Sequence, residues 1–209
     1  MIYLIGGAPR CGKSHLAERV RKYINGQVIA GDAVTAALQK VFTPEWSPDL
    51  FVHKVDPLSK MHLASEKIDR LRRRDETAWD FYQAELETAV KNATHDDNLI
   101  EGNLWPDFIR TLTLPHKAVF LVDTSPKQAT RLIDIRDSDG DNDWMKHYSN
   151  EEMVEWAKLN VLRSERYIKL CQKHSYPYFD IAKFGIEDAS DEAFHALLSK
   201  RGYNNTHKA

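Results

Sequence analysis

The sequence predicts an α/β fold in which a parallel sheet is covered by helices on both faces. Helical patterns separate the apolar runs of the chain, and such alternation is typical of parallel sheets. The 209 residues suit one compact domain, which we expect to span 1–209. Five short apolar runs have the composition of buried strands, the second being the weakest: 2–5, 27–30, 98–100 leading into Glu101, 118–122 and 178–181.

Composition argues against several classes of function. A net charge of −2 is unlike that of proteins that bind a nucleic-acid backbone. No stretch approaches the roughly 18 apolar residues of a membrane span. The two cysteines, Cys11 and Cys171, have neither disulfide nor metal-ligand spacing, which favours a reducing compartment. We therefore expect a cytoplasmic protein without a nucleic-acid or membrane partner.

Capping signals predict three helices in the second half of the chain. The segment SPKQ at 125–128 has the pattern of an N-cap serine, an N1 proline and an N3 glutamine, and predicts a helix to about Arg136. The segment SNEE at 149–152 repeats the capping pattern and predicts a long helix towards Lys173. Ser190 is expected to begin a last helix, which Gly202 can end.

Residues 44–75 interrupt the alternation of strands and helices. A proline-bounded loop, TPEWSP, is followed by an apolar stripe at helical spacing, formed by Met61, Ala64, Ile68 and Leu71. We interpret the region of about 44–93 as a helical insertion on the substrate side of the same domain. A polar, glycine-containing stretch at about 136–148 suits a lid, and its acidic run lacks the residues of a calcium loop.

The strongest signal of function is the pattern G-x-x-x-x-G-K-S between the first strand and a helical pattern. It is formed by Gly7, Gly12, Lys13 and Ser14. Glycines let backbone N–H groups surround phosphate oxygens, the lysine reaches the β- and γ-phosphates, and the serine hydroxyl holds Mg²⁺. We predict a site for ATP or another nucleoside triphosphate, in which Arg10, Cys11 and His15 contribute backbone groups.

With this motif, the chain resembles the P-loop kinases of the nucleoside-monophosphate-kinase-like fold, most closely the 2-phosphoglycerate-kinase and zeta-toxin type. The segments VIAGD, NLIEG and VFLVDTSPKQATRLIDIRD carry the rest of the resemblance, over about residues 1–185. The segment DGFPR of adenylate kinases is missing, and EGNLWPD stands in its place. The resemblance implies a five-stranded parallel sheet of order 2-3-1-4-5 with the active site at the carboxyl ends of the strands.

Three acidic residues at strand ends are candidates for the site. Asp32 follows a strand and could orient an acceptor hydroxyl and take its proton, or it could cap the helix that begins nearby. Glu101 ends the strand that the resemblance places beside the P-loop strand, and it is our candidate for the Mg²⁺ side together with Ser14. Asp123, at the end of VFLVD, remains the alternative to Glu101.

Several basic residues are candidates for contacts with phosphate or acceptor groups. Arg131 and Arg136 lead into the predicted lid, where arginines can close on a transferring phosphoryl group, and we assign both a catalytic role. The alternative for each is a solvated arginine on the helix surface. Arg163 and Arg166 are weaker candidates for the same role. The cluster RLRRR at 70–74 either lines a pocket for an anionic acceptor or forms a solvated helix face.

Aromatic and thiol groups near these motifs complete the expectations. Trp46, Trp79 and Trp105 lie in or beside the presumed acceptor region, and Trp105 could wall the pocket near Glu101. Cys11 lies at a helix N-terminus beside Lys13, a setting that predicts a lowered thiol pKa and easy oxidation.

The sequence thus predicts a small-molecule kinase that uses ATP and Mg²⁺. It would transfer the γ-phosphoryl group to a hydroxyl or phosphate of a small acceptor. The alternative is a nucleotide-binding switch or nucleotidase that needs no small acceptor.

Overall fold

A five-stranded parallel sheet forms the centre of the protein in a computed structural model that describes residues 1–24, 26–51, 63–91, 97–138 and 144–199. Its strand order, β2-β3-β1-β4-β5, confirms the predicted order 2-3-1-4-5. All five apolar runs form strands, some longer than predicted: β1 Ile2–Gly7, β2 Gly26–Ala30, β3 Asp97–Glu101, β4 His116–Val122 and β5 Tyr178–Asp180.

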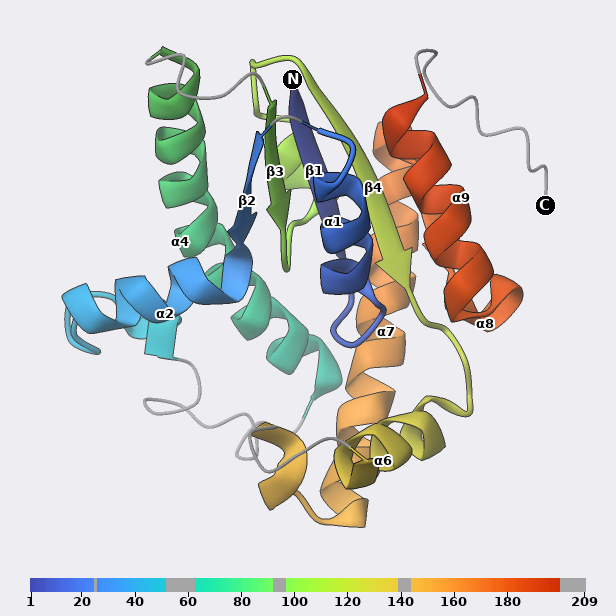
Figure 1. Ribbon diagram of the computed structural model, residues 1–209. Coiled ribbons are helices and arrows are strands. Elements are labelled where there is room, and N and C mark those ends of the chain that lie inside the picture. Colours follow the sequence, from blue (N-terminus) through green and yellow to red (C-terminus); the bar gives the residue numbers. More distant parts are fainter. Residues whose placement is uncertain (25, 52–62, 92–96, 139–143, 200–209) are drawn as a thin grey trace.

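Helices cover both faces of this sheet, as predicted (Figure 1). On one face, α1 (Lys13–Arg21), α8 (Ile181–Phe184) and α9 (Ile186–Leu198) pack against strand residues such as Ile5 and Leu121. On the other face, α4 (Ala64–Lys91), α5 (Pro106–Ile109) and α7 (Asn150–His174) pack against residues such as Leu4 and Phe120. Because successive side chains of a strand point to opposite faces, each strand supplies both cores.

The remaining described elements surround the carboxyl ends of the strands. They are α2 (Gly31–Val41), the 3₁₀ helix η1 (Pro48–Phe51), α6 (Gln128–Ser138) and the 3₁₀ helix η3 (Trp144–His147). Among the described residues, none of the helices is both long enough and apolar enough to cross a lipid bilayer.

Helix α4 contains the described part of the apolar stripe predicted within the insertion. Ile68 and Leu71 are buried, as the spacing predicted, and the stripe continues through Trp79 to Leu86 in the core beside the sheet. Met61 lies outside the described residues, as does the stretch 139–143 of the predicted lid. The assignment of 44–93 as a substrate-side insertion and of 136–148 as a lid stays a prediction.

The three predicted helix starts have different outcomes. The capping box of α7 is confirmed, because Ser149 Oγ accepts from Glu152 N and the Glu152 carboxylate accepts from Ser149 N. The start predicted at 125–128 is confirmed in part: Ser125 Oγ accepts from the amide of Lys127, as expected of a capping serine, but α6 begins only at Gln128. The side-chain amide of Gln128 donates to the carbonyl of Asp123 and does not reach back to Ser125. Helix α9 begins at Ile186, after Gly185 with φ of 81°, and not at Ser190. Gly202 lies outside the described residues.

Candidate active site

The loop between β1 and α1 requires glycine at both ends. Gly7 has φ of 123°, and a Cβ there would lie 1.9 Å from the carbonyl oxygen of Leu121 in β4. Gly12, the N-cap of α1, is left-handed with φ of 82°. Side chains rarely tolerate such angles, so these two positions explain the glycines of the motif. The first amides of α1 have no carbonyl partner within the helix, and the residues that carry them, Lys13, Ser14 and His15, line the cavity described below.

Lys13 begins α1 and lies almost completely inside the loop. Its Nζ donates a 2.7 Å hydrogen bond to the carbonyl of Ala8. Burial lowers the pKa of Lys13, while Cys11 and the carboxylate of Glu101 act in the opposite direction. A buried ammonium held by one loop carbonyl is suited to bind an anion, because phosphate oxygens would compensate for the water that burial removes.

Ser14 and Glu101 meet across neighbouring elements. The parallel pairing of β1 with β3 places Glu101 opposite Ile5, just before the loop, and the Ser14 hydroxyl donates to Glu101 Oε1 over 3.3 Å. Burial raises the pKa of Glu101, whereas Lys13 lowers it. A hydroxyl beside a carboxylate is a donor set that fits Mg²⁺, which takes few protein ligands and keeps waters and phosphate oxygens. Among the described residues, no group of three or more His, Cys, Asp or Glu side chains could hold a metal ion.

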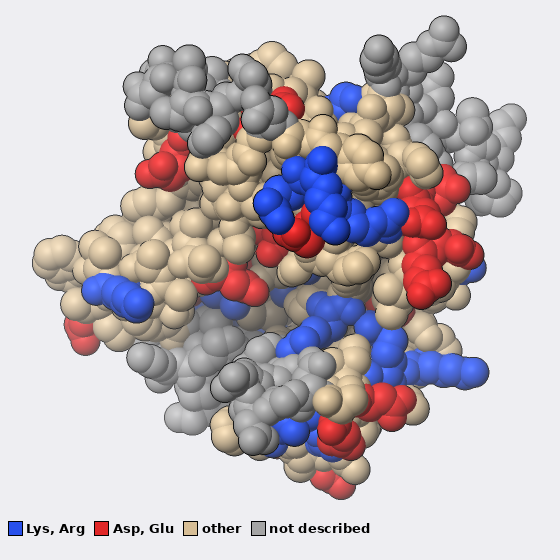
Figure 2. Space-filling model, in the orientation of Figure 1, with Lys and Arg blue, Asp and Glu red and all other residues tan. Residues whose placement is uncertain are grey.

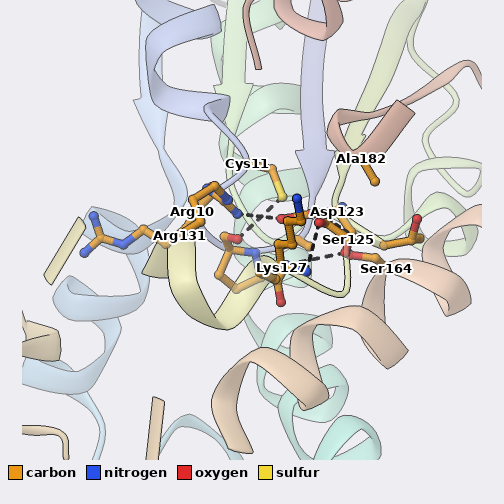
Figure 3. A network of polar contacts seen from close by, with 12 residues as sticks. Arg10, Cys11, Asp123, Ser125, Lys127, Arg131, Ser164 and Ala182 are labelled. Atoms are coloured by element: carbon orange, nitrogen blue, oxygen red, sulfur yellow. Dashed lines mark hydrogen bonds and ion pairs between the residues drawn. The ribbon is translucent and has the colours of Figure 1, made fainter. Parts of the chain in front are cut away.

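Asp123, the alternative to Glu101, has both carboxylate oxygens engaged. Oδ1 accepts from the amide of Ser125 over 2.9 Å, and Oδ2 accepts from Arg131 Nη2 over 2.7 Å. Figure 3 shows this carboxylate between Arg131 and the turn that leads into α6. The side chain is fully buried and is not among those that line the cavity. These contacts favour Glu101 for the metal side.

Only one of the two arginines near the predicted lid faces residues 7–14 between β1 and α1, which we call the phosphate loop after the sequence motif. Arg131 in α6 donates to the carbonyl of Arg10 over 2.8 Å as well as to Asp123, and it lines the cavity. Arg136 instead binds Asp137, the carbonyl of Tyr148 and the side chain of Asn150 at the start of α7. The structure thus brings Arg131 to the predicted site and does not bring Arg136 there.

A cavity of about 880 Å³ lies at the carboxyl ends of the strands and contains most of the predicted residues. Figure 2 shows a hollow below α1 with Lys and Arg side chains around it. The residues predicted for the site that line it are Arg10, Gly12, Lys13, Ser14, His15, Asp32, Arg74, Glu101, Arg131 and the weaker candidate Arg163. Leu71, Tyr148, Trp156 and Ile186 also line it. One cavity therefore joins the phosphate loop to the side of α4 and α7.

Asp32 is exposed to this cavity from the first turn of α2. The helix begins one residue earlier, at Gly31, and its N-cap is Ala30, with no hydrogen bond from a side chain. The alternative interpretation, in which Asp32 serves as the helix cap, is therefore wrong. The negative charge of Asp32 favours the protonated forms of both Lys13 and Glu101, and for Lys13 it opposes the larger effect of burial on the pKa. Asp32 therefore lies within electrostatic range of the phosphate loop.

The arginine cluster at 70–74 is divided between two environments. Arg70 and Arg73 pair with Asp49, and Arg72 pairs with Asp107. Only Arg74 lines the cavity. The cluster is thus mainly a set of contacts that fix α4 to neighbouring segments.

None of the three tryptophans named from the sequence lines the cavity. Trp46 is 80% exposed and Trp79 is buried in the core. Trp105 does not wall the pocket but is fully buried and stacks on Tyr167, with ring centroids 4.3 Å apart. The tryptophan that lines the cavity is Trp156, which sequence reasoning missed although it lies seven positions before Arg163 on the predicted helix.

The prediction of a reactive Cys11 is wrong. The thiol is 1% exposed, and burial raises its pKa to about 12, although Lys13 acts in the opposite direction. The helix N-terminus and Lys13 suggested the opposite shift, because sequence reveals neighbouring charge but not depth. Cys11 thus contributes its backbone and its packing to the loop.

Comparison with solved structures shows the fold. Shikimate kinase from Bacteroides thetaiotaomicron matches with a TM-score of 0.50 and 13% identity, over 95% of this chain and 98% of that chain. An uncharacterized protein from Eubacterium ventriosum matches with a TM-score of 0.49 and 12% identity, over 94% and 97% of the two chains. No protein-family model and no curated protein matches the sequence. With its strand order and glycine-bounded phosphate loop, the chain has the α/β fold of the P-loop kinases.

Proposed function

We propose that this chain transfers the γ-phosphoryl group of ATP, or of another nucleoside triphosphate, to a hydroxyl or phosphate of a small-molecule acceptor. The observation that carries the proposal is the single cavity in which Lys13, the Ser14–Glu101 pair and Asp32 meet. A site that only binds a nucleotide would need Lys13 and the Ser14–Glu101 pair, but not Asp32. The carboxylate of Asp32, which lines the same cavity as the phosphate loop and has no capping role, would supply a base for an acceptor.

In the proposed reaction, the acceptor oxygen forms a bond to the γ-phosphorus while the bond from phosphorus to the β–γ bridging oxygen breaks. Asp32 orients the acceptor hydroxyl and takes its proton. Lys13 and the loop amides hold the β- and γ-phosphates, and Arg131 stabilises the charge on the transferring group. Ser14 and Glu101 would hold Mg²⁺, directly or through water, and the ion would offset phosphate charge when bound.

A nucleotide-binding switch is the second candidate, and one contact favours it. Arg131 joins the carbonyl of Arg10 in the phosphate loop to α6, so that a nucleotide seated in the loop can alter the position of that helix. The two functions differ in their dependence on an acceptor. A kinase releases ADP rapidly only when its acceptor is present, whereas a switch hydrolyses the nucleotide slowly without one.

The test is acceptor-dependent release of ADP across a panel of metabolites, with Mg²⁺ present. We expect one class of acceptor to accelerate release, and we expect Lys13→Ala to lower turnover at least about 10²-fold because it removes charge stabilisation. Lys158→Ala is the matched control, since Lys158 is exposed on α7 and pairs with Glu155. Undiminished turnover in Lys13→Ala would refute the role of the loop. Nucleotide hydrolysis that no acceptor accelerates would favour the switch.

A further inference from the structure

Two arginines at the α4–α7 side of the cavity share one buried carboxylate. Asp75 Oδ1 accepts from Arg74 Nε over 3.0 Å and from Arg74 Nη2 over 2.6 Å. Oδ2 accepts from Arg163 Nη2 over 2.7 Å and from the indole nitrogen of Trp105 over 2.9 Å. Each carboxylate oxygen of Asp75 thus accepts two hydrogen bonds, and the shared carboxylate fixes the two guanidinium groups relative to each other.

The positive charge of this cluster exceeds its negative charge. Among the ion pairs of the described residues, Asp75 is the one carboxylate that pairs with Arg74 or Arg163. Arg163 is 1% exposed, and its buried Nε has no hydrogen-bond partner among the described residues. The guanidinium carbon lies over the rings of Trp105 and Tyr167, 5.3 and 5.8 Å from their centroids, and these contacts offset part of the cost of burial. A bound anion would compensate the remaining positive charge of the cluster.

The cluster faces the same cavity as the phosphate loop. Arg74 and Arg163 line its wall together with Lys13 and Asp32. Burial lowers the pKa of Lys13, and the charge of Arg163 adds to that effect, so the guanidinium lies within electrostatic range of the loop. An anion bound by Arg74 and Arg163 would therefore lie in the same cavity as a γ-phosphoryl group held by the phosphate loop.

We propose that Arg74 and Arg163 form an anion-binding subsite for the acceptor, which they hold by a carboxylate or phosphate group. This inference rests on the proposed phosphoryl transfer and names its substrate class, a small molecule with an anionic group and a separate hydroxyl. Guanidinium groups suit such anions because their N–H donors match pairs of carboxylate or phosphate oxygens. Leu71 and Trp156 line the cavity with apolar surface that can contact the carbon skeleton between the two groups.

The test uses the indole N–H signal of Trp105, which contacts Asp75 directly. Protein saturated with Mg²⁺ and a non-hydrolysable ATP analogue, which occupies the phosphate loop, is titrated with inorganic phosphate or with acetate. Sodium chloride at equal ionic strength is the reference. Heteronuclear NMR follows the Trp105 signal, assigned with Trp105→Phe. We expect a saturable shift with phosphate, acetate or both, and the anion that acts identifies the charged group of the acceptor.

Matched variants decide whether the arginine pair is responsible. Arg74→Met should weaken anion binding at least tenfold. Arg163→Lys should also weaken anion binding, because lysine keeps the positive charge but lacks the planar guanidinium group. Arg166→Met is the control, because Arg166 lies one turn from Arg163 on α7 but pairs with Asp69. Equal weakening in Arg74→Met and Arg166→Met would overturn the subsite.

The subsite and the proposed function can fail separately. A protein that binds the nucleotide analogue but shows no saturable effect of phosphate or acetate overturns the subsite and leaves phosphoryl transfer standing. A protein that binds no nucleotide overturns the proposed function. Titration of the unliganded protein, with Arg74→Met compared to Arg166→Met, then still decides whether the arginine pair binds anions.

Discussion

Arg131 donates a 2.8 Å hydrogen bond to the carbonyl oxygen of Arg10, although the two residues are 121 positions apart in the chain. The same guanidinium pairs with the fully buried Asp123. The side chain of Arg131 thereby joins helix α6 to the phosphate loop, and Asp123 fixes the direction of that side chain (Figure 3).

We expect Arg131→Lys to lower kcat at least about 10²-fold while the KM for ATP changes less. A lysine keeps the charge but cannot contact the loop carbonyl, the buried carboxylate and a transferring phosphoryl group together. Steady-state kinetics with varied ATP check this expectation. A rise in KM with an unchanged kcat would show that Arg131 binds the nucleotide in the ground state only.

Asp32→Asn should lower kcat far more than it changes ATP affinity, and it should leave stability nearly unchanged. The amide cannot take the proton of the acceptor, whereas the fold loses no cap because Ala30 is the N-cap of α2. Chemical denaturation and nucleotide titration are the two measurements. A loss of about 1 kcal/mol in unfolding free energy, the usual effect of removing a cap, would contradict the assignment.

Glu101→Gln should raise the Mg²⁺ concentration needed for half-maximal activity about tenfold or more, since the amide has no charge to attract the ion. Burial raises the pKa of Glu101. The carboxylate therefore becomes protonated on acidification at a higher pH than an ordinary glutamate, and the Mg²⁺ requirement should rise there. Activity measured against Mg²⁺ at several pH values checks both effects. Asp123→Asn with the same Mg²⁺ profile as Glu101→Gln would contradict the choice between the two acids.

Cys11 should react with thiol reagents much more slowly than free cysteine at neutral pH. Its pKa is raised by burial from 9.0 to about 12, so the thiolate is scarce, and the side chain is inaccessible. The native state therefore holds this proton more tightly than the unfolded chain. The resulting stabilisation is fully present below pH 9 and declines as the pH rises from about 9 towards 12.

Reaction with a chromogenic disulfide and unfolding curves at alkaline pH measure these two effects. Cys11→Ala is the reference for both, because it removes the thiol from a loop that keeps its glycines. Rapid modification of Cys11 in the native protein, with loss of nucleotide binding, would contradict this expectation and support the prediction from sequence that Cys11 is reactive.

The sequence predicted the fold well because buried parallel strands are continuous apolar runs. Even the weakest of them, at 27–30, pairs with β3 as the edge strand β2. Helix starts were less predictable, since their capping groups also have other partners. Ser125 makes a capping contact with the amide of Lys127, but the Gln128 side chain binds the carbonyl of Asp123, whereas the Glu152 side chain reaches back to Ser149 and completes its capping box.

The loop that we propose for phosphate could be grouped from the sequence because its residues are contiguous, and most of them line one cavity. The acceptor side could not, since Arg74 and Arg163 meet only through Asp75, 88 positions from Arg163 in the chain. Which arginine of the cluster at 70–74 faces the cavity depends on the rotation of α4, and a run of like residues gives no period from which to read it. The direction of the Cys11 pKa shift was predicted wrongly for a related reason. How deeply a thiol is buried depends on the packed fold and cannot be read from its neighbours in the sequence.

The 25-residue helix α7 carries Trp156 and Arg163 on one cavity face, and further along the same helix Tyr167 and Cys171 lie in the core beside the sheet. The wall that we propose for the acceptor therefore lies on a helix anchored in the core, separate from the loop that we propose for the triphosphate. Exchanging side chains at positions 74, 156 and 163 offers a route to redirect substrate choice while the nucleotide machinery stays intact.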